Sequence, residues 1–187
     1  DKANEDKPAM CLGSMDVNLL ELVNGYGTVA NYGKHIDPVL VTRIVKTNPD
    51  GTEETIYNYE DEVDANAAIS ARAAYFMQKM LGFGLTDGGG TSQSLTDYVD
   101  TYMNTTDFGG KTGTSNNYSD AWFVGTSPNL VAGAWVGGEY RCIHFTSGAQ
   151  GQGSRTALPI CGRFFQKVWG DSKLRPLVSA KYVGLNM

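Results

Sequence analysis

The order of helix and strand patterns along the 187 residues predicts an α+β fold, in which helices flank an antiparallel sheet. Two amphipathic helix patterns enclose a hairpin pattern, three strand patterns then follow with short connectors, and a last helix pattern comes near the end. Because short connectors join neighbouring antiparallel strands, we expect the three strands to pair consecutively. With 41% hydrophobic and 19% charged residues, the chain can form one globular core.

The first half of the chain contains the first two helices and the hairpin. Residues 16–33 have apolar side chains at helical spacing, with Asp16 as the expected N-cap and Gly33 as the stop. Residues 39–59 consist of two β-rich runs around an Asn-Pro-Asp-Gly turn, which predicts a hairpin. Residues 64–81 carry a helical stripe that we expect to face the core. The stripe comprises Ile69, Ala73, Phe76, Met77 and Met80.

The second half contains the three strands and the last helix. Residues 82–94 include three consecutive glycines and are typical of a loop, and residues 95–103 predict a brief helix. Residues 158–169 predict a helix with Pro159 in its first turn, where the missing N–H does no harm. Three strand patterns lie between these two helices, within residues 108–138. They span residues 108–114, 121–126 and 130–138.

Charge and hydropathy exclude several classes of protein. The net charge of -5 and the pI near 4.9 disfavour a nucleic-acid partner, which would require clustered Lys and Arg. No run approaches the roughly 20 apolar residues of a membrane span. Residues 1–10 lack the apolar core of a signal peptide. We therefore expect any anchor or export signal to lie outside this sequence.

Cysteine and histidine give no sign of a metal site. Cys11, Cys142 and Cys161 include no Cys-x-x-Cys pair, so they indicate neither a zinc site nor a disulfide framework. We expect them to be small buried hydrophobic residues, and oxidation of one pair is the alternative. His35 and His144 are isolated and receive no role in our interpretation. We expect no metal and no organic cofactor.

One short motif carries groups that an acyl-transfer site can use, and the alternative interpretation of it is an exposed strand with a tight bend. Lys111, Thr112 and Gly113, followed by Thr114, lie on a predicted strand. A Lys ammonium can attract a substrate carboxylate, and Thr hydroxyls can donate hydrogen bonds to it. Gly allows another backbone to approach closely. The unpaired N–H groups of an edge strand can bind an extended peptide or stabilise an oxyanion.

The sequence around this motif, residues 109–139, resembles the corresponding region of class A penicillin-binding proteins. In both, Lys-Thr-Gly-Thr is followed by a short loop, an Asp-x-Trp-Phe-Val-Gly strand, a turn with Pro and a Trp-Val-Gly strand. Residues 12–44 and 153–160 are also similar to the family, in the same order. Asp120 and Trp122 match family positions, and we interpret them as a turn-stabilising acid and a core aromatic residue.

The resemblance implies the fold shared by penicillin-binding transpeptidases and serine β-lactamases. It also implies that Lys111 and Thr112 bind the carboxylate of a peptidoglycan stem peptide or of a β-lactam. Thr114 would contribute its backbone N–H to the oxyanion hole and its hydroxyl to the substrate carboxylate. With Gly113 between them, these residues are the expected catalytic and substrate-binding set.

The sequence lacks the nucleophile that such an enzyme requires. No Ser-x-x-Lys occurs, and the two Ser-x-Asn sequences, at 115–117 and 127–129, come after the Lys-Thr-Gly strand, whereas the family places that motif before it. We therefore expect residues 1–187 to be the C-terminal part of a transpeptidase domain that begins downstream of the true Ser-x-Asn. We expect this part to pack against the missing N-terminal half of the same domain. By itself the chain should be inactive, and the intact protein should act in the cell envelope, at the outer face of the cytoplasmic membrane.

Three functions remain open at this level. The first is a serine-type D-Ala-D-Ala transpeptidase that cross-links stem peptides. The second is a β-lactamase or D,D-carboxypeptidase relative, which would share the Lys-Thr-Gly strand but hydrolyse the acyl-enzyme. The third is a non-catalytic module that binds envelope partners. The Trp-Val-Gly strand and residues 153–160 favour the first.

Overall fold

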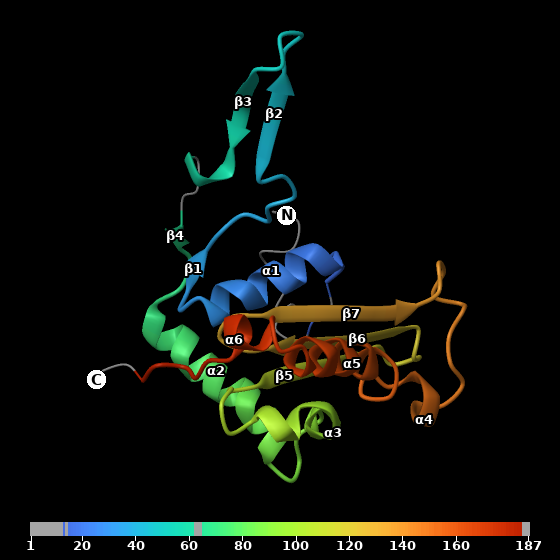
Figure 1. Ribbon diagram of the computed structural model, residues 1–187. Helices are drawn as coiled ribbons and strands as arrows, with labels where there is room; N and C mark the ends of the chain where they lie inside the picture. Colours follow the sequence, from blue (N-terminus) through green and yellow to red (C-terminus); the bar gives the residue numbers. More distant parts are fainter. Residues whose placement is uncertain (1–12, 14, 62–64, 185–187) are drawn as a thin grey trace.

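The structure of this chain is a computed structural model that describes residues 13, 15–61 and 65–184. An antiparallel three-stranded sheet lies at its centre, with helices on both faces (Figure 1). The α+β fold expected from the sequence is thereby confirmed. The strands pair consecutively, as the short connectors predict, in the order β5 (Gly109–Thr114), β6 (Asp120–Thr126) and β7 (Val131–Gly137).

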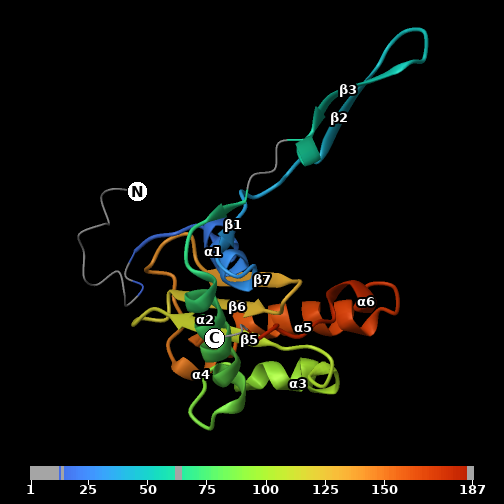
Figure 2. The ribbon, with the colours of Figure 1, turned by 90° about the vertical axis from the view of Figure 1, so that its left-hand side faces the viewer.

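Helices cover the two faces of this sheet. Val124 and Gly125 of β6 point to opposite faces, because successive strand residues alternate. Gly133, which pairs with Val124, lies against α1, whereas Gly125 lies against Phe165 of α5. α2 packs beside α1 and along β5 (Figure 2). The covering helices are α1 (Leu19–Ala30), α2 (Ala71–Thr86) and α5 (Ala157–Gly170).

The main core lies between the sheet and α5. Phe108, Phe165 and Trp169 meet there in tilted and edge-to-face ring contacts. The indole Nε1 of Trp169 donates to Thr106 Oγ1 at 3.1 Å, so its buried polar atom is satisfied. The rest of the cluster consists of Leu85, Leu95, Val99, Phe123, Ala134, Ala157, Leu158 and Cys161.

α1 begins later and ends earlier than the predicted span of 16–33. Asn18, rather than Asp16, is the N-cap: its side chain accepts from Glu21 N at 2.9 Å, and the Glu21 carboxylate accepts from Asn18 N. Asp16 instead pairs with Arg141 at 3.1 Å. The helix ends before Gly33, because the backbone is already left-handed at Tyr32, where φ is 53°. It remains left-handed at Gly33, with a φ of 88°, a conformation that glycine adopts without strain.

α2 also begins later than the predicted start at residue 64, which itself lies outside the described residues. Ser70 is the N-cap and accepts from Ala73 N at 3.2 Å. The residues just before it are extended and form β4 (Asn66–Ala67), which pairs with β1 (Lys34–His35). At its other end α2 continues past residue 81 to Thr86, because Leu85 extends its buried face.

The expectation that the apolar stripe of α2 faces the core is wrong. Phe76, Met77 and Met80 of α2 and Ile69, just before the helix, are 40–63% exposed. Ala73 is exposed as well. The helix buries another face, which includes the polar Gln78; the Nε2 of Gln78 donates to Val29 O at the end of α1, at 2.7 Å. The buried residues are Ala74, Gln78, Leu81 and Leu85. Periodicity identified a true apolar face, but this face is open in the described residues.

The predicted hairpin is present within 39–59 and projects away from the body of the molecule (Figures 1 and 2). Its strands are shorter than the two β-rich runs: β2 spans Arg43–Thr47 and β3 spans Glu53–Asn58. The Asn-Pro-Asp-Gly sequence forms the turn, where Asp50 Oδ1 accepts from Thr52 N and Thr52 Oγ1. These hydrogen bonds stabilise the carboxylate and lower the pKa of Asp50.

The remaining elements are short. The brief helix predicted at 95–103 is split into a helix flanked by 3₁₀ turns, and the predicted final helix at 158–169 is confirmed as α5. Two further one-turn helices precede and follow α5. These elements are the 3₁₀ turns Tyr59–Asp61, Gln93–Leu95 and Asp100–Tyr102, together with α3 (Thr96–Val99), α4 (Gly148–Gly151) and α6 (Arg175–Val178).

Two phenylalanines on different helices provide a matched test of this core. Phe165 is fully buried, whereas Phe76 on the open face of α2 is 45% exposed. We expect Phe165→Ala to lower the free energy of unfolding of the chain by about 3–5 kcal/mol, because it leaves a cavity. Phe76→Ala should change it by less than about 1 kcal/mol. Denaturant unfolding measures both, and equal losses would contradict this assignment of the core.

Candidate active site

The Lys-Thr-Gly motif lies on β5, which is an edge strand of the central sheet. Within the described residues β6 is the only strand that pairs with β5, from Gly109 opposite Thr126 to Thr114 opposite Ala121. The strand emerges from the core along its length: its first two residues are buried, whereas Lys111 and Thr114 are exposed. The motif therefore lies at the exposed end of an open edge.

The free edge of β5 presents the backbone N–H of Thr114. Just beyond the strand, Ser115 N donates to Asp120 O of β6 at 3.0 Å. Because N–H groups alternate in direction along an antiparallel strand, the N–H groups of Thr112 and Thr114 point away from β6. They are available to an extended peptide or to an oxyanion.

Lys111 is exposed, and its ammonium lies along the same edge. Its Nζ donates to the carbonyl oxygen of Thr112 at 2.6 Å. This carbonyl also points away from β6, so the positive charge is held beside the free backbone groups rather than in the core. An exposed ammonium in this place can attract an anionic ligand to the edge.

Thr112 and Thr114 point to the same face of β5, because they are two residues apart. Thr112 Oγ1 donates to Thr91 Oγ1 at 2.7 Å. Thr114 Oγ1 accepts from Gly153 N at 3.1 Å, so the single proton of its hydroxyl remains available for another acceptor. Neither Thr91 nor Gly153 belongs to a motif that assigns it a role from the sequence alone.

Gly153 holds its loop close to the strand. A Cβ at this position would collide with the carbonyl oxygens of Trp122 and Gly113. Only glycine allows the backbone to come near enough for its N–H to reach Thr114 Oγ1. The resemblance of residues 153–160 to the family was a signal for this segment, although not for the contact itself.

Asp120 and Trp122 are not part of the free edge. Asp120 accepts from Ser119 Oγ at 2.7 Å and from Trp135 Nε1 at 3.2 Å, which fits the predicted turn-stabilising role. The ring of Trp122 packs against Trp135 at a centroid distance of 6.2 Å. Trp122 is half-buried rather than fully in the core, because it lies on the partly open α1 face of the sheet.

The cysteines differ from one another. Cys161 is buried, as expected, and burial raises the pKa of its thiol to about 11. Cys142 is exposed, so the expectation of burial is wrong for it; Cys11 lies outside the described residues.

His35 Nδ1 lies 3.1 Å from Thr28 Oγ1 and joins β1 to α1. Among the described residues, no cluster of three or more His, Cys, Asp or Glu could hold a metal ion.

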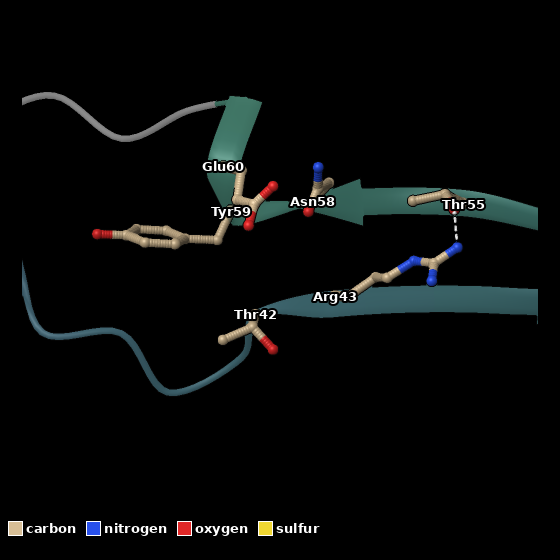
Figure 3. Close-up of a pocket in the computed structure, with 6 residues that line it drawn as sticks. All are labelled: Thr42, Arg43, Thr55, Asn58, Tyr59 and Glu60. Carbon is tan, nitrogen blue, oxygen red and sulfur yellow. Dashed lines mark hydrogen bonds between the residues drawn. The ribbon is translucent and has the colours of Figure 1, made fainter. Parts of the chain in front are cut away.

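A hollow of about 610 Å³ lies at the base of the hairpin rather than at β5 (Figure 3). Arg43 crosses it and donates to Thr55 Oγ1 at 2.8 Å. The hollow is open and lies on a two-stranded projection, away from the Lys-Thr-Gly motif (Figure 1). We therefore assign the candidate site to the edge of β5. The residues lining the hollow are Thr42, Arg43, Thr55, Asn58, Tyr59 and Glu60.

The sequence of residues 3–136 matches the family described as penicillin binding protein transpeptidase domain. The chain belongs to this family. Penicillin-binding protein 1A of Rickettsia bellii is 33% identical over 183 residues, which cover 90% of this chain and 22% of that protein. Penicillin-binding protein 1A of Aquifex aeolicus is 31% identical over 152 residues, covering 81% and 19%. The class A resemblance found in the sequence is thus confirmed.

The fold of this transpeptidase family member also has a solved counterpart. The crystal structure of penicillin-binding protein 1A from Haemophilus influenzae matches 96% of this chain with a TM-score of 0.77, at 20% sequence identity. The match covers 29% of that chain. Against the two sequence relatives above, this chain spans about a fifth of their length. None of the helices in the described part of the chain has the length and apolar character needed to cross a membrane.

Gly153→Ala tests the close approach of the loop to β5. We expect the added methyl to separate the loop from the strand and to lower the free energy of unfolding by about 1–3 kcal/mol, as in other overpacked sites. Gly89→Ala is the matched control, because a Cβ there would meet nothing within 4 Å. Thermal unfolding of both variants is the measurement. An unchanged melting temperature in Gly153→Ala would contradict the contact.

Proposed function

We propose that this chain forms the substrate-binding wall of a peptidoglycan D,D-transpeptidase. The observation that carries the proposal is the free edge of β5, where Lys111, the hydroxyls of Thr112 and Thr114 and the outward N–H of Thr114 lie together. A D-Ala-D-Ala stem ends in a carboxylate next to the amide bond that reacts. A row of donors beside a positive charge is suited to such a ligand.

In this proposal the nucleophile is a serine of the intact protein outside this sequence. Its Oγ attacks the carbonyl carbon of the D-Ala-D-Ala amide, and its proton passes to a basic group and then to the departing D-Ala amine. Thr114 N–H stabilises the oxyanion that forms. The nitrogen of an acceptor amine then attacks the acyl carbon and loses a proton to the basic group; the new amide bond forms the cross-link, the bond from the acyl carbon to the serine Oγ breaks, and that oxygen takes the proton back. A β-lactam would acylate the same serine.

The second part of the proposal concerns the open face of α2. Phe76, Met80 and Phe83 are 45%, 63% and 63% exposed and follow helical spacing of four and three residues. An apolar face of this kind usually contacts another protein surface. We assign it to the remainder of the same transpeptidase domain, which would bring the serine to β5. The intact protein would then act in the cell envelope, as proposed from the sequence.

The alternative functions differ in the fate of the acyl group. A β-lactamase or D,D-carboxypeptidase would transfer it to water, and a non-catalytic module would form no acyl-enzyme. Incubating the intact protein with stem peptide and an acceptor amine separates the three functions. A cross-linked product supports the transpeptidase, free acid alone supports hydrolysis, and unchanged peptide supports the binding module.

Lys111→Ala in the intact protein tests the role of the ammonium. We expect acylation by labelled penicillin to slow by roughly a hundred- to a thousandfold, because the charge assists both carboxylate binding and the transition state. The melting temperature should hardly change, since Lys111 is exposed. Thr112→Val should slow acylation less, because it removes one neutral hydrogen bond.

Two controls accompany this measurement. The isolated chain has no Ser-x-x-Lys and should show no mass increase with penicillin. A stoichiometric adduct on it would place the nucleophile within this sequence. Acylation of Lys111→Ala at the rate of the unaltered protein, or failure of that variant to fold, would refute the catalytic role of the strand.

A further inference from the structure

Thr91 is the partner of Thr112 across the candidate site. The two hydroxyl oxygens are 2.7 Å apart, with Thr112 as the donor. Thr91 does not belong to the sheet: it comes directly after the three glycines between α2 and the next 3₁₀ turn. A residue from a separate loop therefore fixes one of the two threonine hydroxyls on β5.

The loop that carries Thr91 is itself held in place. Gly90 N donates to Asp87 O at 2.9 Å, and Ser92 N donates to Gly84 O of α2 at 3.2 Å. A Cβ on Gly90 would collide with the carbonyl of Gly84, so the loop lies tightly against the helix. Ser92 is 1% exposed, whereas its neighbour Thr91 is exposed and turned toward β5.

The chemistry of two paired hydroxyls suggests what this contact does. A hydroxyl has one proton to donate and can accept two hydrogen bonds. Without a ligand, Thr112 gives its proton to Thr91. When a carboxylate binds at β5, that proton must turn to the carboxylate, and the Thr91 hydroxyl can then donate to Thr112 Oγ1 in return. Such a chain of donors strengthens each of its members.

We propose that Thr91 is a positioning residue, which orients the Thr112 hydroxyl so that it donates to the substrate carboxylate. The inference rests on the proposed function and deepens it. Thr91 acts through Thr112 and not through Lys111, because Thr112 and Lys111 point to opposite faces of the strand. The substrate-binding wall thus includes Thr91, which lies 21 positions before Thr112 in the sequence.

The test uses the intact protein and the second-order rate of acylation by benzylpenicillin. Thr91→Val keeps the shape of the side chain but removes the hydroxyl, and we expect acylation to slow by about fivefold, the effect of one neutral hydrogen bond. Thr91→Ser should restore at least half of the normal rate. Thr101→Val is the matched control on an exposed position of another turn and should react normally.

A double-variant cycle separates positioning from a structural role. In a Thr112→Val background, Thr91→Val should cause no further slowing, because its target hydroxyl is absent. The methyl ester of benzylpenicillin should also show no Thr91→Val effect. Equal slowing in both backgrounds, or normal acylation of Thr91→Val, overturns this inference alone. If the unaltered protein forms no adduct, the proposed function fails, and the inference fails with it.

Discussion

In the described part of the chain β5 pairs with another strand on one side only, and the rest of the site depends on this constraint. β6 aligns the strand, and the outer edge keeps the Thr112 and Thr114 N–H groups available to a ligand. The core beneath supports this arrangement, because Phe108 precedes the strand and packs on Phe165 and Trp169 of α5. The packed interior thus holds β5 in place while its outer edge remains open to a ligand.

Three separate segments converge on that edge. β5 supplies the hydroxyls, the loop before α5 reaches Thr114 through Gly153, and the loop after α2 reaches Thr112 through Thr91. Each loop contains a glycine that leaves space for neighbouring backbone: Gly153 lies against Gly113 and Trp122 of the sheet, and Gly90 lies against Gly84 of α2. The hydroxyl oxygens of Thr112 and Thr114 are therefore held in place before any ligand arrives, so that only the Thr112 proton has to turn, which lowers the cost of ordering the site on binding.

Local signals in the sequence predicted much of this fold. Short connectors predicted the consecutive pairing of the three strands, and the helix predicted at residues 158–169, with Pro159 in its first turn, is α5. The predicted site residues do lie together, because four consecutive residues on a strand share one edge. What the sequence could not predict depends on contacts between distant segments. Periodicity identified the apolar stripe of α2, but it could not show which face of the helix packs on the rest of the chain; in the structure Gln78 is buried and Phe76 is not. Neither Thr91 nor Gly153 could be paired with β5 from spacing, since tertiary packing brings them there.

Hydrogen exchange of β5 in the intact protein tests the central claim most directly. The amide protons of Thr112 and Thr114 point to the free edge, whereas that of Gly113 points to β6. Measured residue by residue with and without a bound β-lactam, exchange at Thr112 and Thr114 should slow when the ligand is present, and exchange at Gly113 should stay unchanged. If the ligand left Thr112 and Thr114 unprotected, β5 would not be the substrate-binding wall.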